Sequence, residues 1–121
     1  DELVSEIFIP HPGKNAVGNF KKLGTRSYLV ISIVMVGVVV ELNEEDEVME
    51  LKVAVGACSP VAKRLGLLEE DVVGQKINSI EIQPLHLESL QPIDDIRASA
   101  SFRKIVTPEL LKRAIQGVKH K

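Results

Sequence analysis

Two short stretches hold the charged side chains of this sequence that are best placed to act chemically. In the first, residues 20–26, three cations stand within one short segment around a glycine: Lys21, Lys22 and Arg26. Such a cluster produces a positive local potential that suits an anionic or electron-rich partner. On composition alone, a solvated loop with a glycine turn is the favoured interpretation of this stretch.

The second stretch, residues 92–104, reads PIDDIRASASFRK and comes directly before a helical pattern. Asp94 and Asp95 can cap free N–H groups at the start of a helix and complement its dipole. We expect Arg97 and Arg103 to pair with these aspartates or with free carbonyl groups through charge-assisted hydrogen bonds. The interpretation is structural: these residues hold the beginning of the last helix.

The remaining chemically active residue types are scattered. His11, His86 and His120 have no second ligand at metal-binding spacing. Cys58, the single cysteine, comes near an expected helix start that would favour a thiolate, but a small buried core thiol is the better interpretation. No glycine-rich phosphate loop follows a predicted strand. The sequence therefore predicts no catalytic residue and no metal site.

Composition limits the class of protein. The chain has 121 residues, 45% of them hydrophobic, which suits a single domain over residues 1–121 with a real core. A net charge of -2 and 3% aromatic residues argue against nucleic-acid binding. One cysteine allows no intrachain disulfide, and no signal peptide or transmembrane pattern is evident, so we expect a cytoplasmic protein. Because the sequence opens directly on a strand pattern, we expect a fragment or a trimmed start.

The most apolar run, residues 28–40, predicts a long central strand. Valine and isoleucine dominate it, and β-branched side chains fit a pleated sheet. Apolar runs or alternation predict antiparallel strands at residues 3–9, 27–42 and 48–55, the last two joined by an acidic turn. Residues 20–26 are expected to be a loop that leads into the central strand.

Helical patterns follow the strands. Ser59 is expected to cap a short helix over residues 61–67, and the last helix is expected to kink or restart at Thr107. Residues 77–90 stay ambiguous because Pro84 interrupts a helical pattern. Strands first and helices afterwards predict an α+β fold, in which an antiparallel three- to four-stranded sheet carries about three helices on one face.

Several blocks of the sequence resemble one family in order and spacing. They are EIFIP (residues 6–10), KLGTR (22–26), VIS (30–32), VGACSP (55–60), PIDDIRASASFR (92–103) and LLKRA (110–114). Together they resemble the C-terminal domain of the FAD-binding, or medium, subunit of molybdenum hydroxylases, the group of carbon monoxide dehydrogenase and xanthine dehydrogenase.

The resemblance implies an electron-transfer role in a larger oxidoreductase. In that family, electrons pass from a molybdopterin subunit through an iron–sulfur subunit to FAD on the medium subunit. A preceding N-terminal domain, absent from this sequence, mainly holds the flavin. The resemblance places Lys22 near the isoalloxazine ring and gives Arg26, Asp94, Asp95, Arg97 and Arg103 structural or interface roles.

The resemblance also implies that this domain alone neither holds FAD nor catalyses a reaction. We expect it to help position the flavin and to dock to the iron–sulfur and molybdopterin subunits. The alternative is a free-standing assembly or interaction module of the same fold that binds no flavin.

Overall fold

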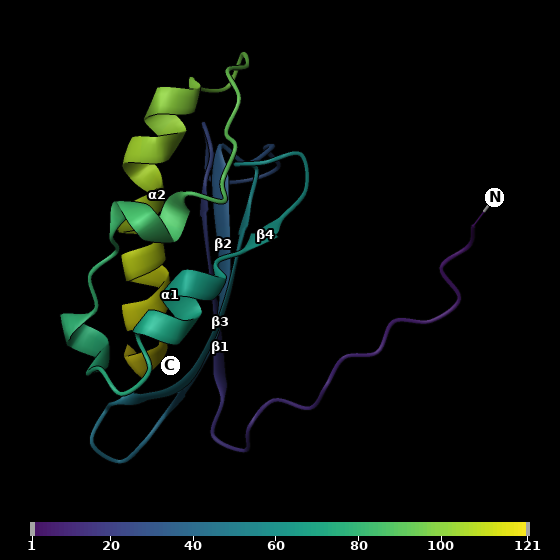
Figure 1. Cartoon of the computed structure of the whole chain (residues 1–121). Helices are drawn as coiled ribbons and strands as arrows, with labels where there is room; N and C mark the ends of the chain where they lie inside the picture. Colours follow the sequence, from purple (N-terminus) through teal and green to yellow (C-terminus); the bar gives the residue numbers. More distant parts are fainter. Residues whose placement is uncertain (1, 121) are drawn as a thin grey trace.

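The computed structural model describes residues 2–120, and these form one antiparallel sheet with helices on one of its faces (Figure 1). The strands are β1 (Val17–Leu23), β2 (Val34–Leu42), β3 (Val48–Gly56) and β4 (Lys63–Arg64). The α-helices are α1 (Gly66–Asp71) and α2 (Ala100–Gln116), and three short 3-10 helices are η1 (Ile77–Ser79), η2 (Pro84–Leu87) and η3 (Gly117–His120). Asp1 and Lys121 lie outside the described residues.

The sheet is a simple meander in the order β1-β2-β3-β4, with every neighbouring pair antiparallel. Strand β2 is central, and four of its valines are buried on one face: Val34, Val36, Val38 and Val40. Between them, Met35 is 36% exposed and Gly37 and Val39 are half-buried, so the opposite face of β2 is more open. The alternation follows from the two-residue period of a strand.

Helices cover the face of the sheet on which these valines lie. Helix α2 packs on β2 and β1, and α1 packs on β3 (Figure 1). The buried side of α2 includes Leu111, Ala114 and Ile115, which join the strand valines in one hydrophobic core. None of the helices in residues 2–120 is long and apolar enough to cross a membrane. The predicted α+β class, with an antiparallel sheet and helices on one face, is confirmed, although residues 2–120 contain two α-helices where about three were expected.

The prediction of a strand at residues 3–9 is wrong. These residues are extended and lead away from the sheet, and Leu3, Phe8 and Ile9 are each at least 80% exposed (Figure 1). The first strand is β1, which occupies part of the stretch expected to be a basic loop. Pairing with β2 decides this, because Phe20 and Lys22 stand opposite Gly37 and Met35 in the ladder. Residues 3–9 have local β propensity, but propensity alone does not make a strand, and these residues have no partner among the described strands.

Two further boundaries differ from expectation. The central strand begins at Val34, not near residue 28, because the chain before it forms an exposed loop. No helix spans residues 61–67: Lys63 and Arg64 extend the sheet as β4, and α1 begins only at Gly66, without a side-chain cap. Ser59 instead donates its hydroxyl to the carbonyl of Cys58. Pairing with β3 overrides the local capping signal.

Helix α2 is continuous across Pro108, so the helix does not restart at Thr107, one of the two outcomes expected there. A proline inside a helix removes one N–H donor, which here leaves the carbonyl of Lys104 without its usual partner. Thr107 donates its hydroxyl to the carbonyl of Arg103 at 2.6 Å, and packing on β2 and β1 holds the helix together. The ambiguous residues 77–90 contain the short helices η1 and η2.

Candidate functional site

Two cations hold the fold of the loop between β1 and β2, residues 24–33. Lys22 flanks this loop and Arg26 belongs to it. Lys22, at the end of β1, donates its ammonium to the carbonyl of Val30 at 2.6 Å. Arg26 donates to the carbonyl of Leu29, a residue with a positive φ of 48°. Positive φ is strained for a leucine, so the arginine holds a tight backbone turn in place.

The same loop presents apolar side chains to the outside. Tyr28, Leu29 and Ile31 are 81%, 92% and 68% exposed. Apolar side chains grouped beside cations are typical of a surface that another protein or domain covers. Lys22, Arg26 and these three side chains therefore make one amphipathic surface, which we call the β1–β2 loop surface.

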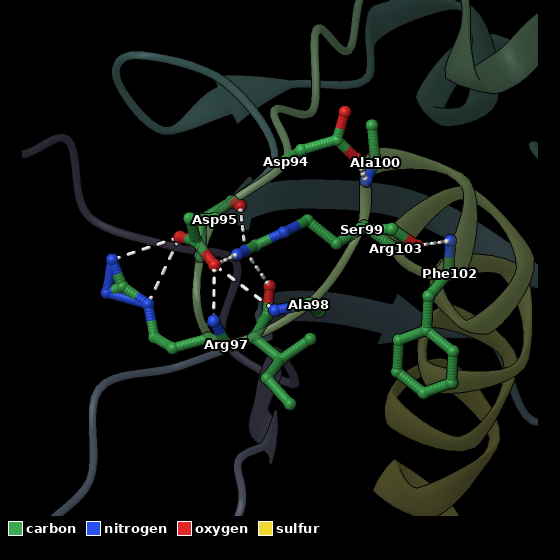
Figure 2. A network of polar contacts seen from close by, with 10 residues as sticks. Asp94, Asp95, Arg97, Ala98, Ser99, Ala100, Phe102 and Arg103 are labelled. Carbon is green, nitrogen blue, oxygen red and sulfur yellow. Dashed lines mark hydrogen bonds and ion pairs between the residues drawn. The ribbon is translucent and has the colours of Figure 1, made fainter.

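The second predicted stretch forms an ion-pair network around Asp95, just before α2 (Figure 2). One carboxylate oxygen of Asp95 accepts hydrogen bonds from the backbone N–H groups of Arg97 at 2.8 Å and Ala98 at 3.1 Å. The guanidinium groups of Arg97 and Arg103 lie 3.0 and 2.8 Å from the carboxylate oxygens. The predicted pairing of both arginines with an aspartate is confirmed.

Asp94 has a different task, since it caps the helix. Its carboxylate accepts the N–H of Ala100 at 2.6 Å, and the hydroxyl of Ser99 accepts the N–H of Phe102 at 3.1 Å (Figure 2). These are two of the donors that the first turn of a helix leaves free. The two neighbouring aspartates thus have different roles: Asp94 caps α2, and Asp95 binds the arginines.

Arg103 connects the network to the sheet. Its side chain is 2% exposed, and its Nη1 atom donates to two carbonyls, that of Ile33 just before β2 and that of Ala57 just after β3, the latter at 2.7 Å. Nη2 lies 2.8 Å from Asp95 without the alignment of a hydrogen bond, and Nε has no hydrogen-bond partner among the described residues. Arg103 therefore fixes the first turn of α2 to the ends of two strands.

Through Ile33, the two candidate stretches meet. The carbonyl of Ile33 binds Arg103, and its N–H donates to the carbonyl of Leu23 at 2.8 Å, next to Lys22. The base of the β1–β2 loop is thus held by the ion-pair network, while Lys22 and Arg26 hold its outer part. Through these contacts, the ion-pair network around Asp95 supports the β1–β2 loop surface.

The electrostatics of Asp95 and Cys58 follow from their surroundings. Burial alone would raise the pKa of Asp95, but the N–H groups of Arg97 and Ala98 and the Arg103 guanidinium outweigh it and hold that pKa below its usual value. Asp95 is therefore ionised at neutral pH. Burial raises the pKa of the Cys58 thiol, and the side chain is 1% exposed, so the predicted buried core thiol is confirmed.

The histidine predictions concern residues far from this site. His86 is buried; its Nδ1 accepts the N–H of Gln83 at 3.0 Å, so Nε2 carries the proton and faces Asp71 at 3.3 Å. His11 is exposed on the N-terminal segment. Among residues 2–119, whose side chains the structure describes, no three histidine, cysteine, aspartate or glutamate side chains come together as a possible metal site.

Sequence reasoning missed two members of the site, the carbonyl groups of Ile33 and Ala57. Backbone carbonyls carry no signal of their own in a sequence, and both lie more than 40 residues from Arg103 along the chain. The one available signal was indirect: an arginine within an apolar helical pattern needs buried acceptors. The exposed apolar residues of the loop were predicted to belong to the central strand, again because a sequence does not show tertiary contacts.

The CO dehydrogenase flavoprotein C-terminal domain family matches residues 19–118, most of the chain. The chain belongs to this family. The resemblance predicted from the sequence is thereby confirmed, and the CO dehydrogenase flavoprotein C-terminal domain includes every strand and helix from β1 to α2 almost in full. No curated protein matches the sequence significantly.

Solved structures share the fold of this CO dehydrogenase flavoprotein C-terminal domain. Reconstituted CO dehydrogenase from Oligotropha carboxidovorans matches with a TM-score of 0.76 at 17% identity, covering 93% of this chain and 40% of that one. Carbon monoxide dehydrogenase from Hydrogenophaga pseudoflava, in a form that lacks the Mo-pyranopterin moiety of its molybdenum cofactor, gives 0.74 at 16%, covering 93% and 39%. Quinoline 2-oxidoreductase from Pseudomonas putida 86 gives 0.75 at 20%, with the same coverage. The chain spans about two fifths of the length of these relatives.

Proposed function

We propose that this chain is the C-terminal domain of an FAD-binding oxidoreductase subunit in a molybdenum hydroxylase of the cytoplasm. In this proposal the domain helps to position the flavin and docks to the iron–sulfur and molybdopterin subunits, so that electrons can pass between them. The family match over residues 19–118 is the observation that carries it. The solved structures of the same fold support it, since a Cu,Mo-CO dehydrogenase is among them.

The β1–β2 loop surface is the part of the domain that we assign to the flavin. Lys22 lies at its edge, and an ammonium group attracts the extra charge of a reduced, anionic isoalloxazine ring. The carbonyl of Val30 holds this ammonium in place, so its position is defined before any partner binds. Apolar Tyr28 and Leu29 beside it offer contact area for a neighbouring domain.

FAD itself would be held elsewhere. The described residues show no glycine-rich loop at the start of a helix that could cradle a diphosphate. A contact with only one edge of the ring rarely offsets the entropy lost on association. The chain alone should therefore bind FAD negligibly and should be colourless when purified.

Substitution of Lys22 in the complete subunit tests the assignment. Lys22→Met should lower the flavin reduction potential, since it removes a charge that favours the reduced ring. Lys21→Met is the matched control, because Lys21 is the exposed neighbour on the same strand and points to the opposite face of the sheet. Equal effects of the two substitutions, or none from Lys22→Met, would remove Lys22 from the flavin site.

The second candidate function is a free-standing assembly or interaction module that binds no flavin. The exposed apolar side chains of residues 3–9 and of the β1–β2 loop surface are compatible with it. Titration of FAD against the complete subunit separates the two: saturable binding with quenched flavin fluorescence favours the flavoprotein, and its absence favours the module.

A further inference from the structure

The ammonium group of Lys22 depends for its position on a residue further along the β1–β2 loop. Its acceptor, the carbonyl of Val30, comes eight residues later in the chain and lies 2.6 Å from Nζ. This distance can be kept only while the loop between the two residues keeps one conformation. Two other residues of the loop, Arg26 and Gly24, act on Val30 and hold that conformation.

Arg26 fixes the peptide group that leads into Val30. Its guanidinium donates to the carbonyl of Leu29, and this carbonyl shares one rigid peptide plane with the N–H of Val30. Leu29 has a φ of 48°, which is unfavourable for a leucine, and its side chain is 92% exposed, so packing within the chain does little to hold it. The bond from Arg26 therefore keeps the Leu29 turn in place, and this turn directs the Val30 carbonyl toward Lys22.

Gly24 makes room for the side chain of Val30. A Cβ atom at position 24 would lie 2.5 Å from Cγ1 of Val30, which is too close for either atom to stay where it is. The φ of Gly24 is not positive, so this close contact, and not backbone freedom, requires a glycine here. Val30 is thus held through its side chain at Gly24 and through its backbone by the turn at Leu29.

The contact with Val30 orients the ammonium of Lys22 without neutralising it. A carbonyl is an uncharged acceptor, and no carboxylate within residues 2–120 forms an ion pair with Lys22 or Arg26. Lys22 therefore keeps its full positive charge at a defined place on the β1–β2 loop surface. Such a charge acts on a nearby anionic ring with a strength that depends on the distance between them.

We propose that Arg26 and Gly24 are positioning residues for Lys22. Through the carbonyl of Val30 they fix where the ammonium lies, and they thereby help to set the reduction potential of the flavin. This inference rests on the proposed flavin function of the domain. Neither residue needs to touch the ring, because each acts through Val30.

The mobility of the Lys22 side chain tests the anchoring in the full chain, without flavin. In 13C relaxation measurements, which report motion on the picosecond to nanosecond timescale, the Cε group of Lys22 should be more ordered than that of its exposed neighbour Lys21. Arg26→Met and Gly24→Ala should each remove this difference. Gly66→Ala is the matched control, because a Cβ atom there meets open space, and it should leave the difference intact. Equal mobility of the two lysines in the unmodified chain, or no change in both variants, would overturn the proposal.

The flavin potential of the complete subunit tests the consequence. Gly24→Ala changes no charge, yet it should lower the reduction potential as Lys22→Met does, because a displaced ammonium stabilises the reduced ring less. In the Lys22→Met background, Gly24→Ala should produce no further shift, since residues that act through one another are not additive. Arg26→Met also removes a charge, and its shift should be smaller in that background than in the unmodified subunit.

The outcomes separate this inference from the function on which it rests. An unchanged or raised potential in Gly24→Ala, or the same shift in both backgrounds, would overturn the positioning role while Lys22 keeps its place at the flavin. No shift from Lys22→Met itself would overturn the assignment of Lys22 to the flavin, and the effect on the potential with it. In that case the relaxation measurements would still decide whether Arg26 and Gly24 anchor the ammonium.

Discussion

Replacement of Arg103 by methionine is the sharpest test of how the ion-pair network supports the β1–β2 loop surface. Methionine keeps much of the apolar stem but has no donors. The carbonyls of Ile33 and Ala57 would each lose the guanidinium that now binds them. Asp95 would keep Arg97 and its two backbone N–H donors, so the damage concentrates on the contact between α2 and the strands.

The size of the effect follows from those two carbonyls. A buried acceptor left without a donor costs about 1–3 kcal/mol. Against this, the guanidinium is itself imperfectly satisfied, since Arg103 Nε has no hydrogen-bond partner among the described residues, and its removal recovers part of the burial cost. We expect a net loss of about 2–4 kcal/mol in the free energy of unfolding, or a fall in Tm of roughly 10 °C.

Urea unfolding followed by far-UV circular dichroism measures this loss, with hydrogen exchange of the Ile33 amide as a local probe. Arg113→Met is the matched control on the same helix, because the Arg113–Glu109 pair is exposed, at 69% and 60%. An exposed pair of this kind should contribute less than about 0.5 kcal/mol. If Arg103→Met costs less than 1 kcal/mol, or no more than the control, the reasoning about the network is wrong.

Three further predictions concern backbone and charge. Pro108→Ala should stabilise the chain by about 1 kcal/mol, seen in urea unfolding, because the new N–H can bind the carbonyl of Lys104. The pKa of Asp95 is lowered in the folded chain, so its contribution to stability is complete above the unfolded pKa near 4 and is lost as pH falls through the folded pKa. Asp95→Asn should therefore lower the stability at pH 7 and weaken the loss of stability at acid pH, as measured by unfolding at a series of pH values. Gly74→Ala should cost about 1 kcal/mol from its positive φ of 81°, whereas Gly66→Ala, with equally open space and no positive φ, should cost nothing in thermal melts.

The fold class and the ion pairs could be predicted because they depend on neighbouring residues. Val34–Leu42 and Val48–Gly56 carry a β-branched or alternating pattern that is typical of strands, and a short acidic turn joins them. Asp95 and Arg97 lie two residues apart, so their pairing needs only a local turn. Local chemistry is sufficient in these places.

Where contacts between distant residues decide the structure, the predictions from the sequence were wrong or incomplete. Residues 3–9 have strand propensity but no partner strand in the described fold, whereas β1, with its lysines and glycine, forms because β2 supplies a ladder. The helix cap predicted at Ser59 does not form, because β4 pairs with β3 instead. Arg103 was placed correctly at the start of α2, but its carbonyl partners belong to the sheet and could not be known before the fold was.

The most direct test of the central claim is isolation of the protein that contains this chain, by an affinity tag placed on it in its natural host. Absorbance spectroscopy and metal analysis of the purified material then report its cofactors. The account predicts flavin and iron–sulfur absorption bands together with molybdenum, in constant ratio to this chain. A colourless protein, free of molybdenum and of FAD after denaturation, would contradict the assignment to a molybdenum hydroxylase subunit and would leave the free-standing module.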